Sequence, residues 1–244
     1  MTALVRTELL KLSWTRATWG LVVAAVLLVL VRVELLLAGV GQVGGPAPHS
    51  SQLTLDVLGT SGLGVFVITF LGVVTATREF HHATLTSTLL ATPDRHRLVL
   101  AKVVAASLTG TAVAALLFLI VAVAGVASDD ITLTVDAPLV RLVAGGLLSA
   151  ACWAWLGLGV GLVVRHQAVA LLVPLLWLVV VETLLSSYGL RVLLPWMPGG
   201  VTRAISGDDF AGVLPVWAAV LVLVGYAAVL TVVGTRRLVR SDVC

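Results

Sequence analysis

Few side chains in this sequence of 244 residues have the types and spacing that catalysis needs. The clearest candidate is Ser61 in Gly59-Thr60-Ser61-Gly62, where a serine between glycines could serve as the nucleophile of an intramembrane serine protease. Such a serine needs a histidine base within hydrogen-bond reach. Of the five histidines, only His49 is expected on the same side of the membrane, by the topology derived below. A structural serine is therefore favoured, and an intramembrane protease is kept as an alternative.

Metal and nucleotide sites find little support in the residue pattern. His81 and His82 are adjacent, so their side chains would point about 100° apart on a helix, and no H-E-x-x-H pattern follows them. A nucleotide-binding P-loop contains a Gly-Lys pair, whereas Lys11 follows a leucine and Lys102 follows an alanine. We therefore expect neither a metal nor a cofactor on this chain, and ATP hydrolysis would require another subunit.

The composition indicates which solvent surrounds the protein. Hydrophobic residues make up 59% of the chain and charged residues 11%, and the mean hydropathy is +1.12. A soluble domain carries about twice that charged fraction. The net charge of +3 includes no basic patch interleaved with aromatic residues, so nucleic acid is not an expected partner. The lipid bilayer is the expected solvent.

Six stretches are apolar over roughly 20 residues, enough for a helix to cross a hydrocarbon core of about 30 Å. Barrel strands would need apolar/polar alternation, which these stretches lack. The predicted spans are 18–39, 57–77, 99–127, 139–164, 168–186 and 212–235. We predict an all-α integral membrane protein in which residues 1–244 form one transmembrane domain of six helices.

The orientation follows from the distribution of basic residues between the spans. Eleven of the fifteen fall before span one, between spans two and three, between spans four and five, or after span six. They are Arg6, Lys11, Arg16, Arg78, Arg95, Arg97, Lys102, Arg165, Arg236, Arg237 and Arg240. The opposite loop between spans three and four carries Asp129, Asp130 and Asp136. Because cytoplasmic loops are enriched in Lys and Arg, both termini are predicted to be cytoplasmic, in the plasma membrane.

Residues 1–17 are predicted to form an interfacial helix that runs into span one. Apolar residues recur at helical spacing from Val5 to Leu12, and Glu8 can pair with Lys11 at i, i+3. An ordinary flanking segment that merely follows the charge rule is the alternative.

The segment 78–102 between spans two and three is polar and basic in an otherwise apolar sequence. Within it, Thr92 is a good helix N-cap, Pro93 suits the first helical position, and Asp94 suits the positive helix end. A second helix is therefore expected to begin here and to run through Lys102 into span three. We predict a cytoplasmic helix–turn–helix elbow over 78–102, with a plain connecting loop as the alternative.

Two features of the later spans could matter for transport. Glu182 is ionisable within span five, which makes it a functional-site hypothesis. It could line a pathway or an outer gate, pair with Arg191 or Arg203, or reach the outer interface; the last two are favoured over substrate contact. The segment 187–211, rich in Pro, Gly and Trp, is predicted to form short interfacial helices as an outer cap.

Small residues within the spans predict close helix packing. Gly157 and Gly161 form a GxxxG pair on span four, which could pack within the fold or across a dimer. Pro174 could kink span five.

Several of these motifs together resemble a known family. The elbow motifs are Glu79-Phe80, Ala83-Thr84-Leu85, Leu89-Leu90-Ala91-Thr92-Pro93-Asp94-Arg95 and Lys102. They resemble the first cytoplasmic loop of bacterial ABC transporter permeases of the type-2, exporter-like class, particularly those of actinobacteria. Glu8-Leu9-Leu10-Lys11-Leu12 and Leu194-Pro195 resemble other parts of such permeases. Ala83 departs from the glycine that is common at its position in the family.

The resemblance implies the membrane-spanning permease subunit of an ATP-driven transporter, which exports its substrate across the plasma membrane. It also implies a cytoplasmic ABC ATPase that holds ATP and Mg²⁺ and receives the elbow, and a second permease copy, identical or related. The residues expected to couple to the ATPase are Arg78, Glu79, Phe80, Pro93, Asp94, Arg95, Arg97 and Lys102. A membrane subunit that transports nothing, such as an assembly or immunity factor, is the alternative.

Overall fold

The computed structural model describes residues 1–42, 45–81, 95–188, 192–207 and 214–240, with side-chain surroundings for all of these except 79–81, 95 and 238–240. Within these ranges every regular element is a helix, and six helical segments are long and apolar enough to cross a membrane. The prediction of an all-α integral membrane protein with six spans is confirmed.

Four spans are single helices and two are composite. The single ones are α2 (Arg16–Leu37), α6 (Arg95–Ala127), α7 (Ala137–Val164) and α11 (Val216–Arg240). The second span consists of α3 (Ser51–Gly59), the 3₁₀ turn η1 (Thr60–Leu63) and α4 (Gly64–His81). The fifth consists of α8 (Gln167–Leu176), the π-helical turn η2 (Trp177–Val181) and α9 (Glu182–Ser187). Outside the spans, the described chain also forms α1 (Thr2–Ser13), η3 (Leu194–Trp196) and α10 (Pro198–Ser206).

The second span begins earlier than its hydropathy predicts, at Ser51 rather than 57. Ser50 explains the difference, because its hydroxyl oxygen accepts a hydrogen bond from the Leu53 amide at 3.1 Å and so caps α3. The predicted helix start at Thr92 lies outside the described residues.

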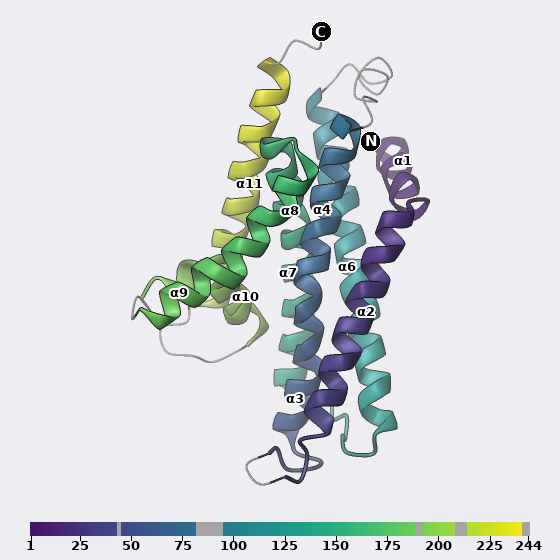
Figure 1. Cartoon of the computed structure of the whole chain (residues 1–244), viewed down its shortest axis with the longest axis vertical. Helices are drawn as coiled ribbons and strands as arrows, with labels where there is room; N and C mark the ends of the chain where they lie inside the picture. The colour runs from purple at the N-terminus through teal and green to yellow at the C-terminus, as the bar shows by residue number, and fades with distance from the viewer. Residues whose placement is uncertain (43–44, 82–94, 189–191, 208–213, 241–244) are drawn as a thin grey trace.

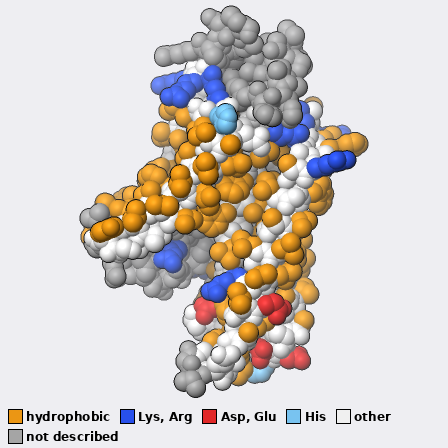
Figure 2. All heavy atoms as spheres, in the orientation of Figure 1, with side chains coloured by type: hydrophobic (Ala, Val, Ile, Leu, Met, Phe, Trp, Pro, Cys, Tyr) orange, Lys and Arg blue, Asp and Glu red, His pale blue; other side chains and the backbone are white. Residues whose placement is uncertain are grey.

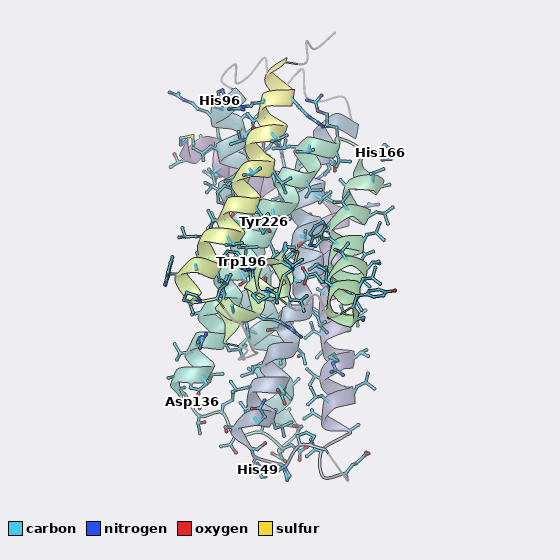
Figure 3. All side chains as sticks on the ribbon, turned by 90° about the vertical axis from the view of Figure 1, so that its left-hand side faces the viewer. His49, His96, Asp136, His166, Trp196 and Tyr226 are labelled. Carbon is cyan, nitrogen blue, oxygen red and sulfur yellow. The ribbon has the colours of Figure 1, made fainter. Side chains whose placement is uncertain are left out.

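The two ends of the bundle differ in charge and in what they carry. Figure 1 shows α1, the N-terminus, the end of α4, the start of α6 and the end of α11 at one end, which we call the basic end. His96 and His166 lie at this end and His49 and Asp136 at the other, which we call the acidic end (Figure 3). Among the described side chains on the face drawn in Figure 2, the acidic ones lie towards the acidic end. This segregation matches the charge distribution from which the orientation was predicted.

Helix α7 is the centre of the fold. It packs against α4 on one side, α11 on another, and α6 and α10 on the remaining faces. Large side chains of α7 such as Trp153 and Leu158 are almost completely buried. The outer spans instead expose leucine and valine side chains along α2, α8 and α11, which Figure 2 shows as a broad apolar surface between the two ends. Lipid contact explains that surface.

Glycines let the neighbouring backbones approach α7 closely. A Cβ atom on Gly157 would lie 2.1 Å from the carbonyl oxygen of Thr69 on α4, and one on Gly161 would lie 2.7 Å from the Cβ of Ala76. On another face, a Cβ on Gly159 would lie 2.8 Å from the Cβ of Leu230 on α11. The GxxxG pair of span four therefore packs within the chain, which resolves the alternative that the sequence left open.

The fifth span changes helical form along its length. Pro174 lies inside α8, where it supplies no amide hydrogen to the helix, and the π-helical turn η2 follows within three residues. Figure 1 shows α8 and α9 running obliquely away from α7, so that α9 and α10 lie about midway between the two ends. The irregularity expected at Pro174 is thus present.

We predict that Gly157→Ala will destabilise the protein by about 1–3 kcal/mol, because α4 must move to admit the added methyl group. The matched control is Gly225→Ala on α11, where a Cβ would meet no atom within 4 Å. Thermal unfolding in detergent measures both. Equal midpoints for the two variants would contradict the close approach of α4 to α7.

Candidate functional site

The structure describes only part of the predicted coupling elbow. Pro93 and Asp94 lie outside the described residues, and the side chains of Glu79, Phe80 and Arg95 are likewise outside what is described. The remaining predicted coupling residues are Arg78 at the end of α4 and Arg97 and Lys102 near the start of α6. Arg97 is exposed and Arg78 is half-buried, whereas Lys102 is buried.

Lys102 forms a buried ion pair with the N-terminal helix. Its ammonium donates to Glu8 Oε2 at 2.8 Å, and each side chain is 5% exposed. The other carboxylate oxygen, Glu8 Oε1, accepts from Lys11 at 2.7 Å, which confirms the predicted i, i+3 pair. Glu8 therefore joins α1 to α6, and Lys102 faces α1 rather than the surrounding solvent. Its role in ATPase coupling stays a prediction, and any such role would act through α1.

The charge state of Glu8 follows from its surroundings. Burial raises the pKa of the carboxyl, and Lys102 and Lys11 together more than offset this, so the pKa lies below its ordinary value of 4.5. The Glu8 carboxyl is thus ionised at neutral pH. Breaking this buried pair is far more costly than losing an exposed one.

Arg78 contacts the short link that follows α1. Its guanidinium donates to the hydroxyl of Thr15, the residue between α1 and α2, and that hydroxyl donates to the carbonyl of Lys11 at 2.6 Å. The corner between α1 and α2 is also closed by Trp19, whose indole nitrogen donates to the Ser13 carbonyl at 2.8 Å. The two helices that lead into and out of the elbow are therefore both bonded to the α1–α2 segment.

Sequence reasoning missed the role of Glu8 because its partner is 94 residues away. One signal was available in the sequence. Glu8 precedes Leu12 by one helical turn, so the carboxylate shares the face of α1 that Leu12 buries. An acidic residue on the buried face of an amphipathic helix calls for a basic partner.

A second cluster of polar contacts surrounds α10. At its N-terminus, the Gly199 amide donates to Glu182 Oε1 at 2.9 Å. At its C-terminus, the Arg141 guanidinium of α7 donates to the Ala204 carbonyl at 3.1 Å. An anionic group at the amino end and a cationic group at the carboxyl end both complement the helix dipole. Glu182 and Arg141 thus hold the two ends of α10 from different spans.

Hydrogen bonds also hold η3 and the middle of α10. The indole nitrogen of Trp153 on α7 donates to Thr202 Oγ1 at 2.8 Å, and the Tyr226 hydroxyl of α11 donates to the Trp196 carbonyl at 3.2 Å. Figure 3 shows Trp196 and Tyr226 next to each other midway along the molecule. Spans four, five and six therefore all bond to the segment from η3 to α10.

The predicted partners of Glu182 are only partly described. Arg203 lies on α10, and its positive charge acts favourably on the Glu182 carboxylate. Arg191 lies outside the described residues. The contact with Gly199 supports a positioning role, and the assignment of Glu182 to a pathway or an outer gate stays a prediction.

Ser61, the candidate for catalysis, lies in an ordinary structural position. Ser61 is buried, and its hydroxyl donates to the Leu58 carbonyl at 2.7 Å, while the His49 ring lies 3.5 Å from Thr132 Oγ1. Among the described residues, no three His, Cys, Asp or Glu side chains gather as a metal site would require. His82 lies outside those residues.

Comparison with known families agrees with this architecture. Residues 4–181 match the family model described as ABC-2 family transporter protein. The matched range extends from α1 to the end of η2, so it includes the elbow and the first four spans. A search of curated proteins finds no match. The chain belongs to the ABC-2 transporter family, and is thus a multi-pass membrane protein and a permease subunit of an ABC transporter.

We predict that Glu182→Leu will loosen α10, because the Gly199 amide and the helix dipole both lose their partner. Hydrogen exchange of the peptide covering residues 198–206 should become about tenfold faster, and Glu182→Gln, which keeps an acceptor oxygen, should have a smaller effect. Glu34→Gln, an exposed change near the end of α2, serves as the control. Unchanged exchange in Glu182→Leu would show that this contact does not hold α10.

Proposed function

We propose that this permease subunit works with a separate cytoplasmic ABC ATPase, which docks on the elbow 78–102 and drives export of a substrate across the plasma membrane. Family membership supports an ATPase partner. The sequence contributes a second argument, because neither of its two lysines follows a glycine and the chain so lacks a P-loop. In this arrangement ATP and Mg²⁺ are bound by the partner.

The main observation that supports the proposal is the arrangement of helices at the basic end. The elbow connects α4 to α6, and both helices pack against α7 at the centre of the bundle. A force on the elbow would therefore act on two spans that contact the core directly. The basic residues at this end support a cytoplasmic location, with both termini on the same side.

We also propose that two permease copies assemble to form the pathway and that α10 contributes to its outer closure. Glu182 would act there as an outer-gate residue, since it links span five to the amino end of α10. The support for a moving span five is its irregular helix, with Pro174 inside α8 and the π-helical turn η2 just before Glu182.

The proposed docking site predicts the effect of charge reversal at the elbow. Arg95→Glu combined with Arg97→Glu should lower the amount of ATPase that co-purifies with the permease by about tenfold, because like charges then face each other across the contact. Quantitative immunoblotting or mass spectrometry of the purified complex measures this loss.

The matched control reverses two other exposed charges at the basic end, Arg6→Glu and Arg236→Glu. This variant should retain its ATPase. Full retention after reversal at the elbow would argue against electrostatic docking there. If wild-type chain retains no ATPase, the alternative of an assembly or immunity factor would gain support.

A further inference from the structure

The N-terminal helix α1 is connected to both helices that leave the elbow. It packs along α6, with Leu12 and Glu8 buried in the contact, and it touches α2 mainly at the corner between the two helices. Its opposite face is exposed and carries Arg6, Leu10 and Trp14. Helix α1 is therefore attached to the bundle by one face, and most of that attachment is to the third span.

The attachment is polar at two separated points. Near the middle of α1, Glu8 pairs with Lys102 of α6 at 2.8 Å. At the end of the segment, Thr15 accepts a hydrogen bond from Arg78 of α4. Arg78 and Lys102 are the first and last residues of the elbow. A displacement of either side of the elbow must strain a bond to α1 or to the α1–α2 corner.

That corner carries the displacement on to span one. Thr15 is the N-cap residue of α2, and Trp19 in the first turns of α2 bonds back to Ser13 of α1. Two hydrogen bonds therefore hold the corner between α1 and α2, one from Thr15 to Lys11 and one from Trp19 to Ser13. Helix α1 thus adds polar connections at the basic end between span one and spans two and three, which also pack directly against α2.

Spans four and six also contact each other directly at this end. Arg237 of α11 donates to the Val163 carbonyl at the carboxyl end of α7 at 3.2 Å, which ties span six to span four. Close packing of glycines adds to this contact, because a Cβ on Gly234 would lie 2.5 Å from the Cβ of Leu162. At the basic end, α1 thus bonds to spans two and three, spans four and six contact each other directly, and α4 packs on α7 between these two sets of contacts.

We propose that α1 is a brace that makes span one move together with the elbow, and that Glu8 is the positioning residue on which this brace depends. The inference rests on the proposed function, in which an ATPase acts on the elbow. Glu8 does not touch the ATPase in this account. It fixes the position of α1 relative to Lys102, and so determines whether movement of the elbow reaches α2.

An ion pair suits this role better than an apolar contact would. Apolar side chains of similar volume often stabilise a buried site as well as an ion pair does. A carboxylate bonded to two ammonium groups differs from such a contact because its hydrogen bonds are directional and fix one relative position of the two helices. The two oxygens of Glu8 bond to different lysines, one on each helix, so they set the position of α6 relative to α1.

The test compares Glu8→Gln, Lys102→Gln and the exchanged pair Glu8→Lys with Lys102→Glu, each purified with its ATPase and reconstituted in lipid nanodiscs. The exchanged pair also carries Lys11→Glu, so that the ammonium group at position 8 again lies between two groups of opposite charge. The two single variants should retain the ATPase but lower its ATP hydrolysis rate in the complex by about tenfold, which corresponds to about 1.4 kcal/mol. The exchanged pair should restore the rate to within about twofold of wild type, because it restores the attraction. Arg6→Gln, an exposed charge removal on the same helix, is the matched control and should leave the rate unchanged.

A second measurement needs no ATPase. Spin labels at positions 6 and 100, both exposed, report the distance between α1 and α6 in the permease alone, with Cys152→Ala and Cys244→Ser as the background. The distance distribution should be narrow in the wild type, broad in Glu8→Gln and narrow again in the exchanged pair. This readout also shows whether each variant is folded.

The outcomes separate the brace from the proposed function. ATP hydrolysis that is retained and unchanged in both single variants overturns the brace while leaving the ATPase partnership intact. Failure of the exchanged pair to restore either readout also overturns it, because the two residues would then act independently. A wild-type permease that retains no ATPase overturns the proposed function itself, and with it the coupling role of α1.

Discussion

The close approach of backbones around α7 is the constraint on which the rest of the structure depends. Gly157 and Gly161 admit α4, Gly159 admits α11, and Gly145 admits α10, where an added Cβ would lie 2.4 Å from the Ile205 carbonyl. In lipid there is little hydrophobic driving force between helices, so such contacts come from packing and from hydrogen bonds. Helix α7 thereby fixes the position of every element that carries a candidate functional residue, either directly or through one neighbour.

Two polar assemblies are built on this centre, one at the basic end and one midway along the molecule. At the basic end, Glu8 and Thr15 join α1 to α6 and α4. Midway along, Glu182 and Arg141 hold α10 at opposite ends of its dipole. The Glu8–Lys102 pair is buried, whereas Arg141 is exposed, so the cost of desolvation falls mainly on the assembly at the basic end.

Hydropathy and charge predicted the spans and the all-α class because the bilayer permits few alternatives. Local spacing also predicted the Glu8–Lys11 pair, and Pro174 indicated an irregular fifth span. Contacts between distant segments were beyond this reasoning. The pairing of Glu8 with Lys102 spans 94 residues, and that of Arg141 with Ala204 spans 63. No local sequence pattern identifies the partner in either of these two contacts. The acidic residue on the buried face of α1 indicated only that Glu8 needed a partner.

The central claim is that an ATPase acts on this permease at the elbow, and photo-crosslinking in intact cells tests it most directly. A photoreactive amino acid at position 97, near the start of α6, is compared with one at the exposed position 135, near the acidic end. The account predicts a light-dependent adduct between position 97 and an ATP-binding protein, and no such adduct from position 135. An ATPase adduct from position 135, or none from position 97, would contradict it.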